Sequence, residues 1–399
     1  MKKSILVISA ALLATSAFAD INGNGYYRVK NYGSQRWASL IDNKGSVNMV
    51  TGTADLHALE LNNDTEEILS DPASIVYLTN VKSNQYNVAA QGTSLKELVG
   101  HEIFIGANGT GTNGQKIYRI WGKQSGATRY ISDADYNNKH QYGQASIIDP
   151  PIAIYKDWEF IPVDVTTDNY FGAVPSVTAD NSLYTSLYTS FGYKPYSEGV
   201  KAYYIGRVGE GKVEMIEIEG DVPGGFPVII ECASQVVSAN RLQLVSTNAT
   251  ISGNSLNGVY FNYSEGSTVN HVAYDPATMR VLGRCEDGSL GFITANINYI
   301  PANSAYLKVS AGASKELKCL SPEDYDSYDA GVDSLIATDS VELKYIGSQI
   351  IGEHGIEISL YNLAGQKIAS SIEGSLNVSN LTQGVYIAKS GNNSIKIVR

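Results

Sequence analysis

Hydrophobic and polar residues alternate along the first part of the chain, from Gly25 to about Val163. Three successive units share one order: a strand, a polar turn and a second strand that begins near an aromatic residue. A period of two is typical of half-buried antiparallel strands, because successive side chains point to opposite faces of a sheet. The predicted strand pairs are residues 26–31 with 36–40, 74–80 with 85–89, and 116–121 with 129–133. Two helix-like stretches, 66–69 and 95–99, interrupt these strands.

The repetition of three units, each about 45 residues long, resembles a β-trefoil of the ricin-type lectin kind. The resemblance covers residues 20–165 and rests on the pattern of aromatic residues and turns. It implies a trefoil-like domain that binds a glycan or a protein ligand.

A second block, residues 170–312, has a different pattern. Residues 213–218 alternate between apolar and mostly acidic positions, whereas residues 228–230 are all apolar, as in a strand buried on both faces. The block resembles a β-domain common in exported proteins of Bacteroidota. The segments that carry this resemblance are Gly-Val-Lys-Ala-Tyr at 199–203, Val-Pro-Gly-Gly-Phe-Pro-Val-Ile-Ile at 222–230, Gly-Phe at 291–292 and Ala-Tyr-Leu at 305–307. We expect a β-rich accessory domain, to which the resemblance assigns no chemistry.

Residues 313–340 are predicted to form an acidic linker. No basic residue occurs between Lys318 and Lys344, while acidic residues accumulate there. These are Glu323, Asp324, Asp326, Asp329, Asp333, Asp339 and Glu342. Such runs are usually solvated and extended.

The last residues, 341–399, again alternate and contain glycine turns. They resemble the C-terminal sorting domain of type IX secretion cargo. The matching positions are Tyr361 and Gly365 in Tyr-Asn-x-x-Gly-Gln, and Gly384 and Tyr386 in Leu-x-x-Gly-Val-Tyr-Ile. The resemblance implies a small β-sandwich that an outer-membrane translocon recognises. The alternative is a final structural β-domain without a sorting function.

The start of the chain predicts export. Lys2 and Lys3 precede a mainly apolar run, and the small residues of Ala17-Phe18-Ala19 end it. This order is typical of a secretory signal peptide over residues 1–19, cleaved near Ala19. The run is shorter than the roughly 20 apolar residues that span a bilayer, so a retained anchor is the less favoured interpretation. We expect no transmembrane segment in the mature chain.

Composition narrows the fold class and the partners. Acidic residues outnumber basic ones, 40 to 29, and the net charge of −11 disfavours nucleic acid as a partner. Abundant Gly (38) and Tyr (27) suit strands joined by tight turns, so an all-β, multi-domain fold is predicted. The cysteines are too few for a disulfide framework, so the fold must rest on hydrophobic cores. Two of them could pair outside the cell, or all three could stay buried thiols: Cys232, Cys285 and Cys319.

No catalytic motif is evident in the chain. Residues 109–114 satisfy Gly-x-Gly-x-x-Gly, but a strand pattern follows where a nucleotide site needs a helix. The five histidines lie far apart, so no metal ligands are predicted, and no cofactor is expected. Carboxylates that meet only in space could still form a glycosidase pair. A secreted hydrolase of glycosides or peptides therefore stays an alternative.

Aromatic residues in the first block are the candidates for ligand binding. Sugars stack their apolar faces on aromatic rings, while nearby polar side chains bind their hydroxyl groups. Trp37 and Tyr130, with Arg129 and Asp133, are therefore predicted to contact a ligand, although the same rings could simply fill the core. We expect a secreted or cell-surface, non-catalytic binding or adhesion protein for a glycan or a host or matrix protein. A structural envelope protein is the third possibility.

Overall fold

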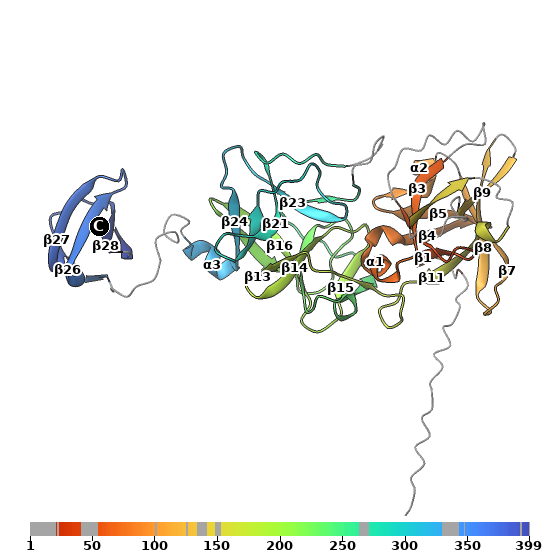
Figure 1. Cartoon of the computed structure of the whole chain (residues 1–399), viewed down its shortest axis with the longest axis horizontal. Coiled ribbons are helices and arrows are strands. Elements are labelled where there is room, and N and C mark those ends of the chain that lie inside the picture. Colours follow the sequence, from red (N-terminus) through yellow and green to blue (C-terminus); the bar gives the residue numbers. More distant parts are fainter. Residues whose placement is uncertain are drawn as a thin grey trace, which may run out of the picture. The chain divides into compact units, whose positions relative to one another are not determined.

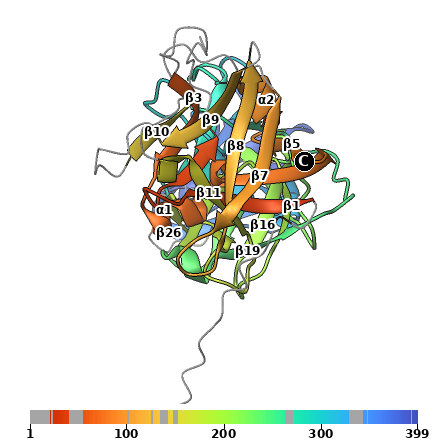
Figure 2. The ribbon, with the colours of Figure 1, turned by 90° about the vertical axis from the view of Figure 1, so that its right-hand side faces the viewer.

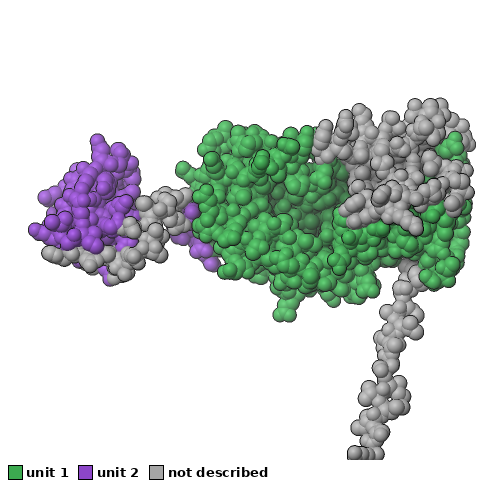
Figure 3. All heavy atoms as spheres, viewed as in Figure 1, with its two compact units in different colours: residues 1–322 green, residues 323–399 purple. Residues whose placement is uncertain are grey.

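The computed structural model describes residues 21, 24–40, 55–99, 102–124, 127–133, 142–147, 153–262, 271–328, 343–346, 348–391 and 393–398. The chain divides into two compact units, Met1–Pro322 and Glu323–Arg399 (Figures 1 and 3). Strands dominate both units, so the predicted all-β, multi-domain class is confirmed. The predicted signal peptide lies outside the described residues.

The first part of unit 1 is an eleven-stranded sheet of antiparallel pairs. Its order is β11-β1-β2-β3-β10-β9-β8-β7-β5-β4, β6 pairs β5, and further pairings of β1 with β4 and of β11 with β8 close the path. The strands are β1 (Gly25–Asn31), β2 (Trp37–Leu40), β3 (Asp55–Asn62), β4 (Ile75–Lys82), β5 (Gln85–Ala90), β6 (Thr93–Ser94), β7 (Ile103–Thr110), β8 (Lys116–Gln124), β9 (Ala127–Asp133), β10 (Tyr142–Ile147) and β11 (Asp157–Pro162). The trefoil assignment stays a prediction.

The inner face of this sheet encloses one hydrophobic core, and Trp158 is a member of this core without exposed surface. The Trp158 indole donates a hydrogen bond of 2.9 Å to the carbonyl of Ile131, so its one polar atom is satisfied. The two predicted helical stretches are confirmed as α1 (Thr65–Ser70) and α2 (Leu95–Val99).

The second part of unit 1 contains a three-stranded sheet, β12-β19-β15, and a ten-stranded sheet, β13-β14-β18-β16-β17-β24-β22-β21-β23-β20. Their bounds are β12 (Phe171–Gly172), β13 (Val177–Ala179), β14 (Ser182–Leu187), β15 (Gly192–Pro195), β16 (Lys201–Gly209), β17 (Lys212–Glu217), β18 (Val228–Cys232), β19 (Arg241–Val245), β20 (Leu256–Val259), β21 (Met279–Arg284), β22 (Leu290–Ile293), β23 (Ser304–Lys308) and β24 (Glu316–Leu320). The all-apolar strand predicted at 228–230 is β18, and Val228, Ile229 and Ile230 have no exposed surface.

The predicted acidic linker is wrong for its first half. β24 pairs in parallel with β17 and antiparallel with β22, and α3 (Pro322–Ser327) follows it. Alternation in Glu316–Leu320 places Leu317 in the core, and this outweighs the charge of the residues that follow. Residues 329–342 lie outside the described residues.

Buried Arg28 joins the two parts of unit 1. Its guanidinium donates hydrogen bonds to the Ser74 hydroxyl at 2.8 Å, to the Asn169 side chain at 2.9 Å and to the Tyr170 carbonyl at 2.7 Å. Burial lowers the pKa of Arg28 to about 10, partly opposed by Asp71, and the group stays charged at neutral pH. The contacts fix the junction at residues 163–170 against the first sheet.

Unit 2 is a five-stranded sheet made of β25 (Lys344–Ile346), β26 (Gln349–Asn362), β27 (Lys367–Asn377), β28 (Val385–Ser390) and β29 (Asn393–Val398). The first half of β26 pairs with β25 and its second half with β28, while β27 follows it along most of its length. Ile350 and Ile358, on either side of a shift in register, are both fully buried in the unit's core.

Candidate functional site

Two of the residues predicted to bind a ligand are buried. Asp133 has no exposed surface, and both of its oxygens lie 3.2 Å from a guanidinium nitrogen of Arg36. Trp37 is also buried, and the ammonium group of Lys30 lies 4.9 Å from its ring centroid. The geometry therefore gives Asp133 an internal partner and gives Trp37 a packing role.

The other two predicted residues, Arg129 and Tyr130, lie half-buried on β9. The guanidinium carbon of Arg119 lies 5.5 Å from the Tyr130 ring centroid, and the Lys156 ammonium lies 5.1 Å from it. Arg36 precedes Trp37 in the sequence and forms an ion pair with Asp133. No described contact, however, brings all four predicted residues to one site. Their role in binding stays a prediction.

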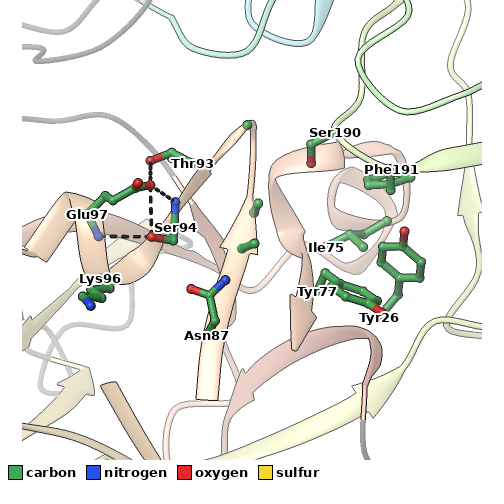
Figure 4. A pocket seen from close by; sticks show the side chains of 13 residues that line it. Tyr26, Ile75, Tyr77, Asn87, Thr93, Ser94, Lys96, Glu97, Ser190 and Phe191 are labelled. Carbon is green, nitrogen blue, oxygen red and sulfur yellow. Dashed lines mark hydrogen bonds between the residues drawn. The ribbon is translucent and has the colours of Figure 1, made fainter. Parts of the chain in front are cut away.

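A pocket of about 560 Å³ lies elsewhere on unit 1, where β4 and β5 meet the segment between β14 and β15. Figure 4 shows aromatic side chains on one side of it and polar side chains from β6 and α2 on the other. Its lining residues are Tyr26, Ile75, Tyr77, Asn87, Ala89, Ala90, Gly92, Thr93, Ser94, Lys96, Glu97, Ser190 and Phe191. This volume lies within the range typical of small-molecule sites.

Strand register explains why these side chains share one face. Tyr26 is paired with Tyr77, Tyr77 with Ala89, and Ala89 with Ser94, across β1, β4, β5 and β6. Directly paired residues of antiparallel strands point to the same face, and Asn87 joins the row two positions before Ala89. Ala89 lies between Tyr77 and Ser94 in this row. Because its side chain is small, the space between the two larger residues stays open and forms the pocket.

The aromatic wall consists of three rings, of which that of Tyr26 contacts the other two. The ring centroids of Tyr26 and Tyr77 are 4.8 Å apart, with planes tilted by 52°. Phe191 meets Tyr26 edge to face at 5.9 Å. Burial, and then the neighbouring Tyr77, raises the pKa of Tyr26, so its hydroxyl stays protonated at neutral pH.

The polar wall is a capping box at the start of α2. The Ser94 hydroxyl accepts a hydrogen bond from the Glu97 amide at 3.2 Å, and the Glu97 carboxylate accepts one from the Ser94 amide at 2.9 Å. Hydroxyl groups of Thr93 and Ser94 also donate to Glu97, at 2.9 and 3.0 Å. These bonds, that from Thr93 first, hold the pKa of Glu97 below its usual value, so the carboxylate is charged at neutral pH.

Contacts with the second part of unit 1 fix the remaining wall. The amide of Gln91 donates to the Ser190 hydroxyl at 3.0 Å. The side chains of Gln91 and Asn303 form two reciprocal hydrogen bonds of 2.8 Å, and both residues are buried. A Cβ at Gly92 would lie 2.5 Å from the ring of Tyr260, so this close approach requires glycine.

Acidic, imidazole and thiol groups are scarce in the described lining of the pocket. Glu97 is the one carboxylate among its described lining residues, and these include no histidine or cysteine. Across the described residues, no group of three His, Cys, Asp or Glu side chains could hold a metal ion. All three cysteines are free thiols, and burial raises the pKa of Cys232 to about 12 and of Cys285 to about 11, which disfavours a thiolate nucleophile.

Sequence reasoning missed this pocket, although parts of it were visible. Ser94-Leu95-Lys96-Glu97 is a capping-box pattern, and alternation around Tyr26 and Tyr77 places both away from the core residues Tyr27 and Val76. Ser190 and Phe191 gave no such signal.

In unit 2, the positions predicted for sorting lie in and around β26 and β28. Tyr361 is half-buried opposite Ile387, and buried Tyr386 donates from its hydroxyl to the Thr382 carbonyl at 2.9 Å. Gly365 has a φ of +77° in the turn after β26, as expected for a glycine turn. Gly384 lies in a bend just before β28, with a φ outside the left-handed region.

Comparison with protein families identifies the end of the chain. Residues 337–399 match the family described as a secretion system C-terminal sorting domain. This match indicates secretion by the type IX system, a secreted or cell-surface location, and interaction with the secretion machinery. No curated protein is significantly similar to the chain. Among the described residues, no helix has the length and apolar character needed to cross a membrane.

Proposed function

We propose that this protein binds glycans without catalysis, through the pocket beside Tyr77, after its C-terminal sorting domain has directed it out of the cell. The observation that carries the proposal is the opposition of an aromatic wall and a hydrogen-bonding wall across one hollow. The rings of Tyr26 and Tyr77 offer stacking surfaces to a sugar, and Asn87 and Glu97 offer polar atoms to its hydroxyl groups.

The single carboxylate supports binding over glycoside hydrolysis. Glycosidases typically use two carboxyl groups, one of which must donate a proton. Glu97 is held ionised by the hydrogen bonds of the capping box, so it is a poor proton donor at neutral pH. We propose that it accepts hydrogen bonds from sugar hydroxyl groups.

Screening the mature full-length chain on a glycan array, followed by calorimetry with each positive glycan, tests the proposal. Tyr77→Ala should weaken binding at least about fivefold through lost stacking, and Asn87→Ala about three- to tenfold through a lost hydrogen bond. Tyr196→Ala removes an exposed tyrosine that follows β15 and does not line the pocket, so it is the matched control and should bind normally.

Two outcomes would overturn this function. Release of reducing ends or peptides during incubation would indicate a hydrolase. Absence of any bound glycan would favour a protein ligand or the structural envelope role.

Export is tested separately. Deletion of residues 341–399 should hold the protein in the periplasm, measured by fractionation and surface protease accessibility. Normal surface display of the truncated chain would refute a sorting role for this segment.

A further inference from the structure

A second aromatic feature lies on the outer face of the same sheet. Phe104 on β7 is paired with Trp121 on β8, and Trp121 is paired with Tyr130 on β9, so the three rings form one row across three strands. Figure 2 shows these strands side by side. All three residues are half-buried, and they point away from the core that contains Ile105, Ile120 and Ile131. We call Phe104, Trp121 and Tyr130 the aromatic row.

The position of Trp121 within the row depends on a glycine. The rings of Phe104 and Trp121 are nearly parallel, at 15°, with centroids 5.9 Å apart. The edge of the Trp121 ring rests above Gly106, where a Cβ would lie only 2.6 Å from atom Cη2. Gly106 therefore permits the orientation in which Trp121 aligns with Phe104.

Cationic groups gather at the Tyr130 end of the row. Arg119 and Lys156 both lie over the Tyr130 ring, and exposed Lys123 projects from β8 on the same face. Asp157 offsets part of this charge, because it pairs with Arg119 at 3.0 Å. Glu102 is a second carboxylate on this face, opposite Lys123 by the register of β7 and β8, and it forms an ion pair with Lys96. In a chain with a net charge of −11, the surplus of cations beside the row is a local exception.

We propose that the aromatic row is a second binding surface, specific for an anionic glycan chain that carries carboxylate groups. Its sugar rings stack along Phe104 and Trp121, and its carboxylates approach Lys123, Lys156 and Arg119. The aromatic rings supply stacking surfaces for the sugar rings. The cations supply a selection for carboxylates that the pocket, with its ionised Glu97, does not offer. This surface stands on residues other than those of the pocket, so it does not rest on the function proposed above.

Calorimetry of the full-length chain with a short oligogalacturonate tests the proposal, and the methyl ester of the same oligosaccharide is the uncharged control ligand. The acid should bind, its affinity should fall as salt screens the charges, and the ester should bind at least about tenfold more weakly. Equal binding of acid and ester would overturn the charge selection. Binding of anionic lipid vesicles without binding of oligogalacturonate would overturn the choice of ligand.

Three variants locate the site. Trp121→Ala should weaken binding of the acid at least about fivefold, and Gly106→Ala should weaken it by displacing the indole without removing it. Lys123→Gln tests the charge at an exposed position where folding is not at risk, with Lys194→Gln on β15 as its matched control. Tyr77→Ala should leave oligogalacturonate binding intact, so failure of the pocket and failure of the row are distinguishable. Unchanged affinity in both Trp121→Ala and Lys123→Gln would refute the site.

Discussion

The region around Arg36 and Asp133 and the pocket beside Tyr77 use similar side chains in the same sheet, yet solvent reaches them differently. Trp37 is paired with Lys30 across β1 and β2, and that lysine reaches over the indole ring. Asp133 meets Arg36 and keeps no exposed surface. At the pocket, by contrast, Tyr77 has Tyr26 as its neighbour on one side and Ala89 on the other, and the methyl group of Ala89 is too short to cover the ring.

This difference indicates that a small neighbour on one side of an aromatic ring leaves that side of the ring available. A long side chain opposite an aromatic ring covers the face of the ring, whereas an alanine leaves a space that a ligand can enter. The same logic applies to the carboxylates. The carboxylate of Asp133 is bound by the buried guanidinium of Arg36, whereas the carboxylate of Glu97 accepts hydrogen bonds in the wall of an open pocket.

The largest effect should come from breaking the buried ion pair. Asp133→Ala leaves the Arg36 guanidinium buried without its carboxylate, and we expect a loss of about 3–5 kcal/mol in the free energy of unfolding, measured with urea. Asp168→Ala removes an exposed carboxylate and should change stability by less than about 0.5 kcal/mol. If Asp133→Ala instead had normal stability and lost glycan binding, the region around Arg36 and Asp133, and not the pocket beside Tyr77, would be the binding site.

The next largest effect on stability should come from breaking the Gln91–Asn303 pair, which joins the pocket to the second part of unit 1. Gln91→Ala and Asn303→Ala should each cost about 1–3 kcal/mol, because each leaves the side-chain oxygen of the other buried amide without its donor. Urea unfolding of the single and double variants forms a double-mutant cycle. We expect a coupling energy of about 0.5–3 kcal/mol, and strictly additive losses would show that the reciprocal pair contributes no shared energy.

The sequence patterns predicted what local alternation and short motifs control. Three consecutive apolar residues identified β18 as a buried strand, and the glycine turn at Gly365 appears as expected. β24 was missed because its five residues lie next to an acidic run, and its pairing with β17 and β22 comes from distant parts of the chain.

The pocket could not be predicted because it depends on contacts between residues far apart in the sequence. Gln91 bonds to Ser190, 99 residues away, and to Asn303, 212 residues away. Alternation can place Tyr77 on an outer face, but it cannot show which distant segment will cover that face. For the same reason, nothing in the sequence showed that Arg36 and Asp133, 97 residues apart, would form a buried ion pair.

A smaller effect should follow from removing the cap of α2. Ser94→Ala eliminates the hydroxyl that accepts from the Glu97 amide, and we expect a loss of about 1 kcal/mol in unfolding free energy. Ser94→Thr keeps a hydroxyl and is the matched control. Because the cap forms the polar wall, Ser94→Ala should also weaken glycan binding in calorimetry, and unchanged affinity would separate the cap from the site.

The smallest effect is the pH dependence that Glu97 adds. Its pKa is lower in the folded protein than in the unfolded chain, so its contribution to stability is fully present above the unfolded value of about 4.3 and is lost as the pH falls through the folded pKa. Glu97→Gln keeps an acceptor for the capping box but cannot titrate, so its urea midpoint should fall less steeply with acid than that of the native chain. Glu66→Gln on α1, which removes an exposed glutamate without a capping bond to its carboxylate, should retain the native slope. Parallel acid profiles for Glu97→Gln and the native chain would mean that the carboxylate is not held by the cap, and the polar wall would then lose its fixed charge.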